Sequence, residues 1–490
     1  MARQSHRSAR PAFPGGEAQW SFVDAYARWM FYARDAWWSA AADPGMLAGI
    51  RAGRLESLVR HAAANSAFYR RRYGRLGAAP VPLEALEPVT KRELMADFDA
   101  WVTDPQCTRE RVEAFADDPR LIGKPFLGRY GVWTSSGTTG VHGLFVEDPD
   151  ALAVYDALST TRFAKLGRVD AWNPFVRLAA AGSRLALVAA TEGHFAGVST
   201  WERLRATYPW VAARARVFPV TAPIEETCRG IAAFEPAFIA SYPTMLRLLA
   251  EERLAGRLEV EPAALWAGGE WCAPAARAVI ERAFDCPLVE DYGASEFMNI
   301  AWQCPEGALH VNADWLCLEP VDEKYRPVPP GEPSATVLLT NLANRVQPRI
   351  RYDLGDSVMM PARPCACGSA FPVVKVEGRR DDILRLSDAR KRRVAILPLA
   401  ITTAIEEGAE VHRFQVEQTA AAELLVRLAC GAREARPLGE KVRRVLANYL
   451  ARHGLANVSI AIRRGLKRAH ALSGKGRQVW RSDAAARRDS

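Results

Sequence analysis

The sequence predicts an α/β protein, in which a large N-terminal domain with a mostly parallel sheet is joined by a hinge to a small C-terminal α+β domain. At 490 residues the chain is too long for one compact core, so more than one domain is expected. Short apolar runs alternate with helical patterns from about residue 125 to 380, which is typical of parallel strands with helical connections. The strand-like runs are 185–190, 238–240, 265–267 and 337–340, and the helices between them include 243–252 and 274–283.

The N-terminal part is predicted to be a lead-in followed by helices. Residues 1–19 lack the apolar core of a secretion signal and are expected to be disordered. Residues from about 20 to 75 place apolar side chains at helical spacing. An aromatic cluster in the first helix would also suit a membrane surface, but charged residues interrupt it, so we expect a packed core face. The cluster comprises Trp29, Phe31, Tyr32, Trp37 and Trp38.

A highly charged segment, Gly378-Arg379-Arg380-Asp381-Asp382, follows a strand-like run at 373–376. We place a domain boundary there, which gives a large domain at 20–380 and a small mobile domain at 381–490. The small domain is expected to contain strands near 412–417, 424–428 and 458–462 and a helix near 438–452.

Composition and charge exclude several classes of protein. Hydrophobic residues make up 49% and charged residues 25%, as in ordinary globular proteins. No stretch approaches the roughly 20 apolar residues of a membrane span, so we expect a cytoplasmic protein. The net charge is +9, but residues 461–490 contribute +7 of it, so a nucleic-acid binder is disfavoured. This basic segment is either a solvated tail or a contact for a phosphorylated co-substrate. The oligomeric state stays open.

A loop of hydroxyl residues and glycines is the clearest chemical signal. It reads Thr134-Ser135-Ser136-Gly137-Thr138-Thr139-Gly140 and follows a predicted strand end. Glycines let backbone amides approach a ligand closely, and consecutive N–H groups form an anion site to which the hydroxyls add donors. The loop lacks the lysine and spacing of G-x-x-x-x-G-K-[ST]. On its own the stretch also fits a surface turn.

Four more segments and a lysine follow this loop. Tyr292 could stack on a base, Glu296 is an oxygen ligand suited to Mg²⁺ near phosphates, and Asp356 could accept ribose hydroxyls. Alone, each also fits a turn, a core residue or a solvated carboxylate. The segments are Ala267-Gly268-Gly269-Glu270, Asp291-Tyr292-Gly293-Ala294-Ser295-Glu296, Tyr352-Asp353-Leu354-Gly355-Asp356, the charged segment at 378–382, and Ser473-Gly474-Lys475-Gly476-Arg477.

Taken together in this order, these segments resemble the adenylate-forming superfamily of acyl-CoA synthetases, peptide-synthetase adenylation domains and luciferases. The closest branch looks like phenylacetate–CoA ligase, and the resemblance runs from about Leu58 to Lys475. It implies that residues Thr134 to Gly140 hold the β- and γ-phosphates of ATP. Lys475 would meet the carboxylate and the α-phosphate, and Asp381 would be the hinge. The other implied roles are adenine contacts by Gly268, Gly269, Glu270, Asp291, Tyr292 and Gly293, Mg²⁺ binding by Glu296, and ribose binding by Asp356 and Arg379.

The implied activity is an ATP-dependent, AMP-forming ligase that adenylates an aryl or acyl carboxylic acid and transfers it to CoA. Transfer to a carrier protein or an amine is an alternative, and a non-catalytic nucleotide-binding relative is another. The sequence departs from the family pattern at two places that affect the predicted activity. The loop is followed by Val141-His142-Gly143 where many members have a lysine, and Leu384-Arg385-Leu386-Ser387-Asp388 lacks the usual glycine-rich turn, which leaves the acceptor open. We expect the acid pocket near 195–201 and 241–244.

Three cysteines and one histidine form a candidate zinc set: Cys304, His310, Cys365 and Cys367. Their number and type suit a closed structural site, although neither spacing is that of a standard finger. From spacing alone, buried thiols are the favoured explanation. Members of the phenylacetate–CoA ligase branch look similar here, which implies structural Zn²⁺. Cys317 is a substitute ligand in this hypothesis.

Overall fold

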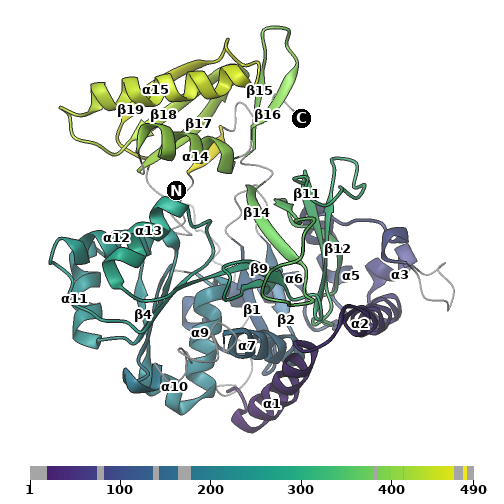
Figure 1. Ribbon diagram of the computed structural model, residues 1–490. Coiled ribbons are helices and arrows are strands. Elements are labelled where there is room, and N and C mark those ends of the chain that lie inside the picture. The colour runs from purple at the N-terminus through teal and green to yellow at the C-terminus, as the bar shows by residue number, and fades with distance from the viewer. Residues whose placement is uncertain are drawn as a thin grey trace, which may run out of the picture.

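The structure is a computed structural model that describes residues 19–73, 82–135, 143–163, 178–191, 193–379, 383–396, 398–411, 413–467 and 478–482. It confirms the predicted α/β class. A large body contains most of the chain, and a smaller lobe formed by the C-terminal elements lies above it (Figure 1). The predicted boundary at 380 and 381 and residues 1–18 of the predicted lead-in at 1–19 fall outside the described residues.

The region predicted to be helical at 20–75 forms three helices. Ser21 caps the first by accepting a hydrogen bond from the Asp24 amide, and Asp43 caps the second through the Met46 amide, with Pro44 at its first position. Short helices follow before the first strand, and Thr90 and Glu93 form a reciprocal capping box at one of them. The helices are α1 (Phe22–Ser39), α2 (Pro44–Asn65), α3 (Ala67–Tyr73), α4 (Lys91–Ala96), α5 (Phe98–Trp101) and α6 (Arg109–Ala116).

A nine-stranded sheet forms the centre of the body, in the order β13-β14-β9-β8-β7-β6-β5-β3-β4. The strands from β4 to β7 are parallel, as expected from the alternating apolar runs, whereas those from β7 to β13 pair antiparallel, so the sheet is mixed. The strands are β3 (Leu185–Ala189), β4 (Ala215–Pro219), β5 (Phe238–Ser241), β6 (Ala264–Ala267), β7 (Leu288–Ala294), β8 (Phe297–Gln303), β9 (Leu309–Val311), β13 (Asp356–Met359) and β14 (Val373–Arg379).

Helices and two smaller sheets surround the central sheet. The helices are α7 (Pro149–Phe163), α9 (Ala196–Thr207), α10 (Pro209–Arg214), α11 (Ile224–Phe234), α12 (Pro243–Leu254) and α13 (Pro274–Phe284). The antiparallel pair β1 (Gly131–Thr134) and β2 (Leu144–Glu147) brackets the hydroxyl-rich loop. The antiparallel strands β10 (Leu316–Val321), β11 (Thr336–Asn341) and β12 (Arg349–Asp353) form a three-stranded sheet.

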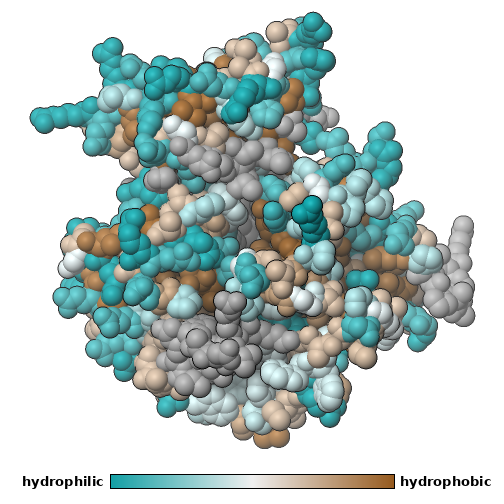
Figure 2. Space-filling model, viewed as in Figure 1, coloured by the Kyte–Doolittle hydropathy of each residue, from teal (hydrophilic) through white to brown (hydrophobic). Residues whose placement is uncertain are grey.

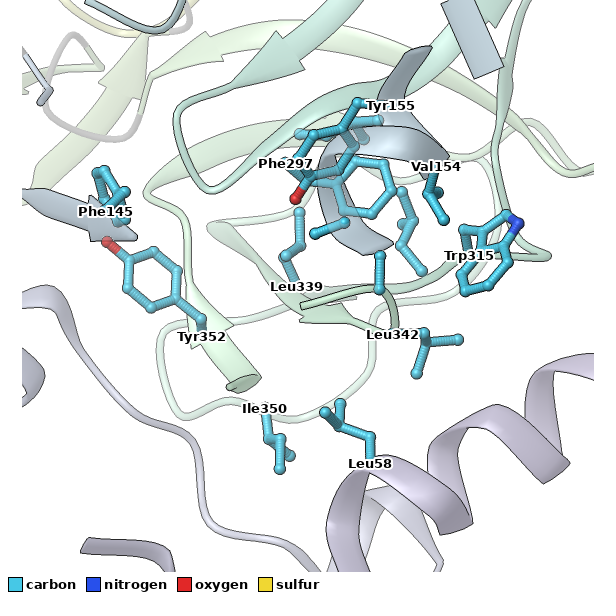
Figure 3. Packing of buried hydrophobic residues seen from close by; sticks show 14 of the residues in the cluster. Leu58, Phe145, Val154, Tyr155, Phe297, Trp315, Leu339, Leu342, Ile350 and Tyr352 are labelled. Atoms are coloured by element: carbon cyan, nitrogen blue, oxygen red, sulfur yellow. The ribbon is translucent and has the colours of Figure 1, made fainter. Parts of the chain in front are cut away.

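The largest apolar core joins the N-terminal helices to the strands around the site. Leu58 of α2 points toward Ile350 and Leu342, and the rings of Tyr155 and Phe297 pack 5.0 Å apart (Figure 3). Beside this core lies a buried ion pair between Arg349 and Glu147, both 0% exposed. The core therefore fixes the positions of β2, β8 and β12 relative to one another.

The C-terminal lobe has a core of its own. Its sheet has the order β19-β18-β17-β20, and α14 and α15 pack against each other beside it, with Val442, Leu446 and Leu450 buried. Hydrophilic residues dominate the visible face of this lobe (Figure 2). The elements are β15 (Leu384–Ser387), β16 (Arg393–Ile396), α14 (Pro398–Ala409), β17 (Phe414–Ala420), β18 (Glu423–Leu428), α15 (Ala435–Arg452), β19 (Ser459–Arg464) and β20 (Val479–Arg481), which confirm the strands and the helix predicted here.

The aromatic cluster of α1 differs from the sequence expectation. Trp37 and Trp38 are 60% and 71% exposed and Phe31 is 58% exposed, so the expectation of a packed core face is wrong for them. Trp29 and Tyr32 are half-buried, and Trp29 packs toward α7 by donating a hydrogen bond to Thr160. Only one side of α1 therefore contacts the body. Among the described residues, no helix combines the length and the apolar character needed to cross a membrane.

Candidate active site

A cavity of about 320 Å³ opens at the edge of the central sheet where parallel strands end. The carboxyl ends of parallel strands are a common place for ligand sites, because the connecting loops diverge there. Its lining comes from segments far apart in the sequence. Of the residues predicted for the site, it includes Thr134, Ser135, Gly268, Gly269, Asp291, Gly293, Glu296 and Asp356. It also includes residues 195–198, 201, 241 and 242 from the stretches expected to form the acid pocket.

Glycine is required at two positions of the cavity wall, because neighbouring atoms lie too close to leave room for a side chain. A Cβ on Gly268 would lie 2.5 Å from Oδ1 of Asp291, and one on Gly293 would lie 2.1 Å from the carbonyl oxygen of Met298. Side chains at these positions would displace the neighbouring carboxylate or strand. The bare backbone therefore forms this wall of the cavity.

Thr134 and Ser135 stand at the entrance to the hydroxyl-rich loop. The Thr134 amide donates a hydrogen bond to the carbonyl of His194 (2.6 Å), which joins β1 to the segment before α9. Ser135 and Gly143 close the base of the loop, since the Ser135 amide donates to the Gly143 carbonyl (3.0 Å) and the Ser135 hydroxyl accepts from the Gly143 amide (3.0 Å). The predicted phosphate ligands Ser136, Gly137, Thr138, Thr139 and Gly140 lie outside the described residues.

Lys91 is a cationic residue of this cavity that the sequence analysis missed. Its Nζ atom lies 3.3 Å from the Ser135 hydroxyl and 3.5 Å from Oε1 of Glu296. The side chain is 18% exposed, so its charge is partly shielded from water. The capping box at Thr90 marks the start of α4, but nothing in the local sequence distinguishes Lys91 from a surface lysine. Only the tertiary fold places it beside the loop.

Glu296 is held rigidly in the turn between β7 and β8. Its carbonyl accepts hydrogen bonds from Asn341 (3.0 Å) and Arg349 (2.9 Å), and its carboxylate accepts one from the Tyr352 hydroxyl (2.7 Å). The residue is 5% exposed. A carboxylate fixed in this way at a cavity wall is suited to a cation or to the phosphates that accompany one.

Asp356 and Tyr292 form a pair at the rim of the cavity. The Tyr292 hydroxyl donates a hydrogen bond to Oδ2 of Asp356 (2.7 Å). The Tyr292 ring is buried in the main core, and the residue does not line the cavity, so it orients Asp356 here. The backbone of Asp356 pairs with that of Arg379 across β13 and β14. Lys475 and Asp381 lie outside the described residues.

Glu270 also lies outside the cavity lining. Its carboxylate accepts hydrogen bonds from the Thr244 hydroxyl (2.7 Å) and the Thr244 amide (3.3 Å) at the first turn of α12. This contact satisfies a free amide at the helix start. This contact thereby fixes the end of β6 against α12, next to Gly268 and Gly269.

The four predicted zinc ligands meet in one cluster. The ligand atoms of Cys304, His310, Cys365 and Cys367 all lie within 4.8 Å of one another. The Cys304 and Cys365 sulfurs are 3.8 Å apart, and the Cys367 sulfur is 3.3 Å from Nε2 of His310. Tetrahedral zinc with Zn–S bonds of about 2.3 Å separates neighbouring sulfurs by about 3.8 Å, so the arrangement fits the ion. Cys317 lies on β10 and is not part of the cluster.

The histidine of this cluster is oriented for metal binding. Its Nδ1 atom lies 2.7 Å from the carbonyl of Phe371, which fixes Nδ1–H as the donor and leaves the Nε2 lone pair toward the sulfurs. The cluster joins the turn after β8 to the segment before β14, and His310 pairs with Val373 in the sheet. The cluster therefore lies beside the pairing of β9 with β14, and β14 pairs in turn with β13, which begins at Asp356.

Solved structures share this architecture. A crystal structure of 2-hydroxyisobutyryl-CoA ligase in the postadenylation state with R3-HIB-AMP is 20% identical, covers 88% of this chain and 89% of its own, and has a TM-score of 0.62. The same ligase with 2-HIB-AMP and CoA in the thioesterification state covers 90% and 91% at 20% identity, with a TM-score of 0.52. The chain has the fold of the adenylate-forming ligases. No protein-family model and no curated protein sequence matches it.

Within the adenylate-forming fold, the structure brings together most of the described residues that the resemblance selected. Ser135, Glu296 and Asp356 come from three separate segments and line one cavity. Glu270 and Tyr292 take supporting positions beside it. The backbone of Arg379 pairs with that of Asp356 at the rim of the cavity. The roles of all these residues remain predictions.

Asp291 is a carboxyl group buried at the wall of the cavity. Its Oδ1 atom accepts a hydrogen bond from the Trp266 indole (2.8 Å). Burial raises the pKa of Asp291 to about 7, and the hydrogen bond from Trp266 offsets only part of this effect. The group therefore changes its charge near neutral pH, within the cavity.

We expect the stability of the protein to fall as pH rises from about 4 to about 7 because of Asp291. The folded state holds this proton more tightly than the unfolded chain does, so deprotonation favours unfolding, by at most about 1.4 kcal/mol per pH unit. Asp291→Asn keeps an acceptor for Trp266 and should make the slope shallower, measured by urea unfolding across that window. The exposed Asp285→Asn is the control. Equal slopes in the wild type and Asp291→Asn would contradict the assignment.

Proposed function

We propose that this protein is an ATP-dependent, AMP-forming ligase that adenylates an aryl or acyl carboxylic acid and transfers the acyl group to CoA. The observation that carries the proposal is the convergence of Lys91, Ser135, Glu296 and Asp356 on one cavity. A hydroxyl and an ammonium at one end suit phosphates, and a carboxylate at the rim suits ribose hydroxyls. The fold shared with 2-hydroxyisobutyryl-CoA ligase supports the same assignment.

In the first step, a carboxylate oxygen of the acid attacks the α-phosphorus of ATP. The bond from that phosphorus to the bridging oxygen breaks, and pyrophosphate leaves with both electrons. Ser135 and Lys91 would hold the β- and γ-phosphates, and Asp356 the ribose. Glu296 would hold Mg²⁺, which neutralises phosphate charge when it is bound. Lys475 is proposed to meet the α-phosphate. Catalysis then consists of positioning and charge stabilisation.

In the second step, the CoA thiolate attacks the acyl carbon of the adenylate. The bond from that carbon to the phosphate oxygen breaks and AMP leaves, which is a far better leaving group than the oxide of a free carboxylate. We propose that the small lobe turns about the hinge at Asp381 to admit CoA, as other two-domain enzymes close and open around ligands.

Acid-dependent pyrophosphate release is the test of this function. We expect AMP and pyrophosphate in equal amounts with at least one acid of a chemically varied panel, and an acyl-CoA product when CoA is present. Adenylate formation without a CoA product would indicate a carrier protein or an amine as the acceptor. ATP binding without turnover on any acid would support a non-catalytic nucleotide-binding protein instead.

We propose that the cluster of Cys304, His310, Cys365 and Cys367 holds a structural zinc ion. Four protein ligands close the coordination sphere, which leaves no position for a substrate. The metal would lock the turn after β8 to the start of β14.

Substitution of one zinc ligand is expected to remove the metal. Purified protein should contain about one zinc ion per chain, and Cys367→Ser should lose most of it and unfold at a lower temperature, because metal binding contributes to folding. Elemental analysis and thermal unfolding measure the two effects. Cys430→Ser, a half-buried cysteine in the small lobe, is the matched control. A Cys367→Ser protein that retains zinc at the wild-type level would refute the site.

A further inference from the structure

A second cavity, of about 480 Å³, adjoins the candidate active site. One face of α9 forms a wall of it through Gly197, Trp201 and Leu204, which recur at helical spacing. Residues of α1, α7 and α10 and of the strands β3, β5, β6, β7 and β8 also line it. The cavity therefore lies between the helices of this face and the sheet.

Aromatic rings form the floor of this second cavity. The Phe163 ring stacks on Trp266 at 5.7 Å, and Phe238 packs edge-on against both, 5.9 Å from Phe163 and 6.1 Å from Trp266. The α7 carboxylate in the lining, Asp156, is paired with Arg203 at 2.6 Å. The other carboxyl group of the lining, Asp291, accepts a hydrogen bond from the Trp266 indole and also lines the first cavity. Away from Asp291, the lining offers apolar rings and a carboxylate that is already paired, which suits an uncharged hydrophobic group.

The two cavities adjoin along a shared wall. Six residues line both of them: Gly197, Trp201, Ala240, Trp266, Asp291 and Met298. Gly197 lies near the start of α9, and a Cβ built on it meets no atom within 4 Å. A glycine inside a helix costs roughly 0.5–1 kcal/mol relative to alanine. Among the described residues, no packing contact requires glycine at this position, so the open space beside it is available to a ligand.

We infer that the acid adenylated by this protein carries an uncharged hydrophobic group at least as large as an aromatic ring, and that Gly197 determines this specificity. The inference rests on the proposed function. The carboxylate would remain in the first cavity beside the nucleotide, and the hydrophobic group would pass Gly197 into the second. An apolar cavity of about 150 Å³ already holds benzene, so the second cavity has room for more than one ring.

The outer end of the second cavity reaches the surface. Tyr26 and Trp210 line that end and are 42% and 48% exposed. Groups longer than the cavity would therefore extend toward α1 and α10. Small acids would leave the aromatic floor without a partner and would gain none of its binding energy.

A panel of acids tests the substrate class on the wild-type protein. We expect kcat/KM in acid-dependent ATP–pyrophosphate exchange to be at least about tenfold higher for benzoate and naphthoate than for acetate and 2-hydroxyisobutyrate. Higher values for the two small acids would overturn the inference while leaving the proposed function intact. Exchange with none of the acids would count against the proposed function, and calorimetric binding of naphthoate would then test the cavity by itself.

Gly197→Leu tests the role assigned to Gly197. Leucine favours the helix and fills only open space, so the variant should fold, and we expect it to lose at least about tenfold in kcat/KM for naphthoate, mainly through KM. Calorimetric affinity for naphthoate should fall with it, and the loss for naphthoate should exceed the losses for acetate and ATP, because only naphthoate needs the second cavity. Gly53→Leu is the matched control, since Gly53 is an exposed helical glycine of α2 with no atom near its Cβ position. Unchanged naphthoate binding in Gly197→Leu, or a comparable loss for ATP, would refute the assignment.

Discussion

Lys91→Met is expected to lower kcat/KM for ATP by at least about a hundredfold. The Lys91 ammonium lies beside both the Ser135 hydroxyl and the Glu296 carboxylate, at the base of the hydroxyl-rich loop. Methionine keeps the length and the apolar stem of the side chain but removes the charge. The variant would leave the buried Glu296 carboxylate to repel the phosphates of ATP, so both ATP binding and the first chemical step should suffer.

Exchange kinetics and direct ATP titration measure this effect. Arg92→Met is the control, because Arg92 follows Lys91 on α4 and is exposed. It should alter kcat/KM for ATP by less than about twofold, as is usual for an exposed charge. If Lys91→Met behaves like Arg92→Met, the phosphates do not lie at this end of the cavity, and the orientation of the nucleotide proposed above is wrong.

The second large effect is on stability. Arg349→Met is expected to destabilise the main body by about 3–5 kcal/mol, because it leaves the Glu147 carboxylate buried without its partner. Arg349 also donates hydrogen bonds to the Glu296 carbonyl and to Gln347 (3.1 Å). Urea unfolding followed by fluorescence measures the change. We also expect weaker ATP binding, since the turn that carries Glu296 loses one of its two carbonyl contacts.

A double variant separates charge burial from packing. Glu147→Gln combined with Arg349→Met removes the uncompensated charge, so it should be more stable than Arg349→Met alone. Arg345→Met serves as the control in the same segment, because Arg345 is only half-buried and bonds to Ser57 through a side chain (2.8 Å). A double variant less stable than Arg349→Met would mean that the remaining hydrogen bonds of Glu147, rather than its charge, dominate.

The parallel half of the sheet was predictable because its strands are short apolar runs between helices. The antiparallel half was not, since β8, β9 and β13 have mixed burial patterns and depend on pairing with strands distant in the sequence. Motif order selected Ser135, Glu296 and Asp356 for the site. Lys91 was missed because its contact with Ser135 spans 44 residues and no local pattern accompanies it.

For α1, the sequence prediction failed in a different way, because it buried aromatic side chains that are exposed. Charged residues interrupt the aromatic cluster of α1, and this pattern led us to expect that Trp37 and Trp38 pack into a core. Their exposure of 60% and 71% is a property of how α1 docks on the body, with Trp29 and Tyr32 on the contacting side. The prediction of a helix was correct, but fewer of its aromatic side chains are buried than expected.

The position of Arg379 has a mechanical consequence. The last strand of the body, β14, ends at Arg379, directly opposite Asp356 in the sheet. The polypeptide tether of the small lobe thus leaves the body from the rim of the cavity itself. If the small lobe turns about the hinge proposed at Asp381, the rotation axis would lie close to this rim, so a wide swing of the lobe would move the rim very little.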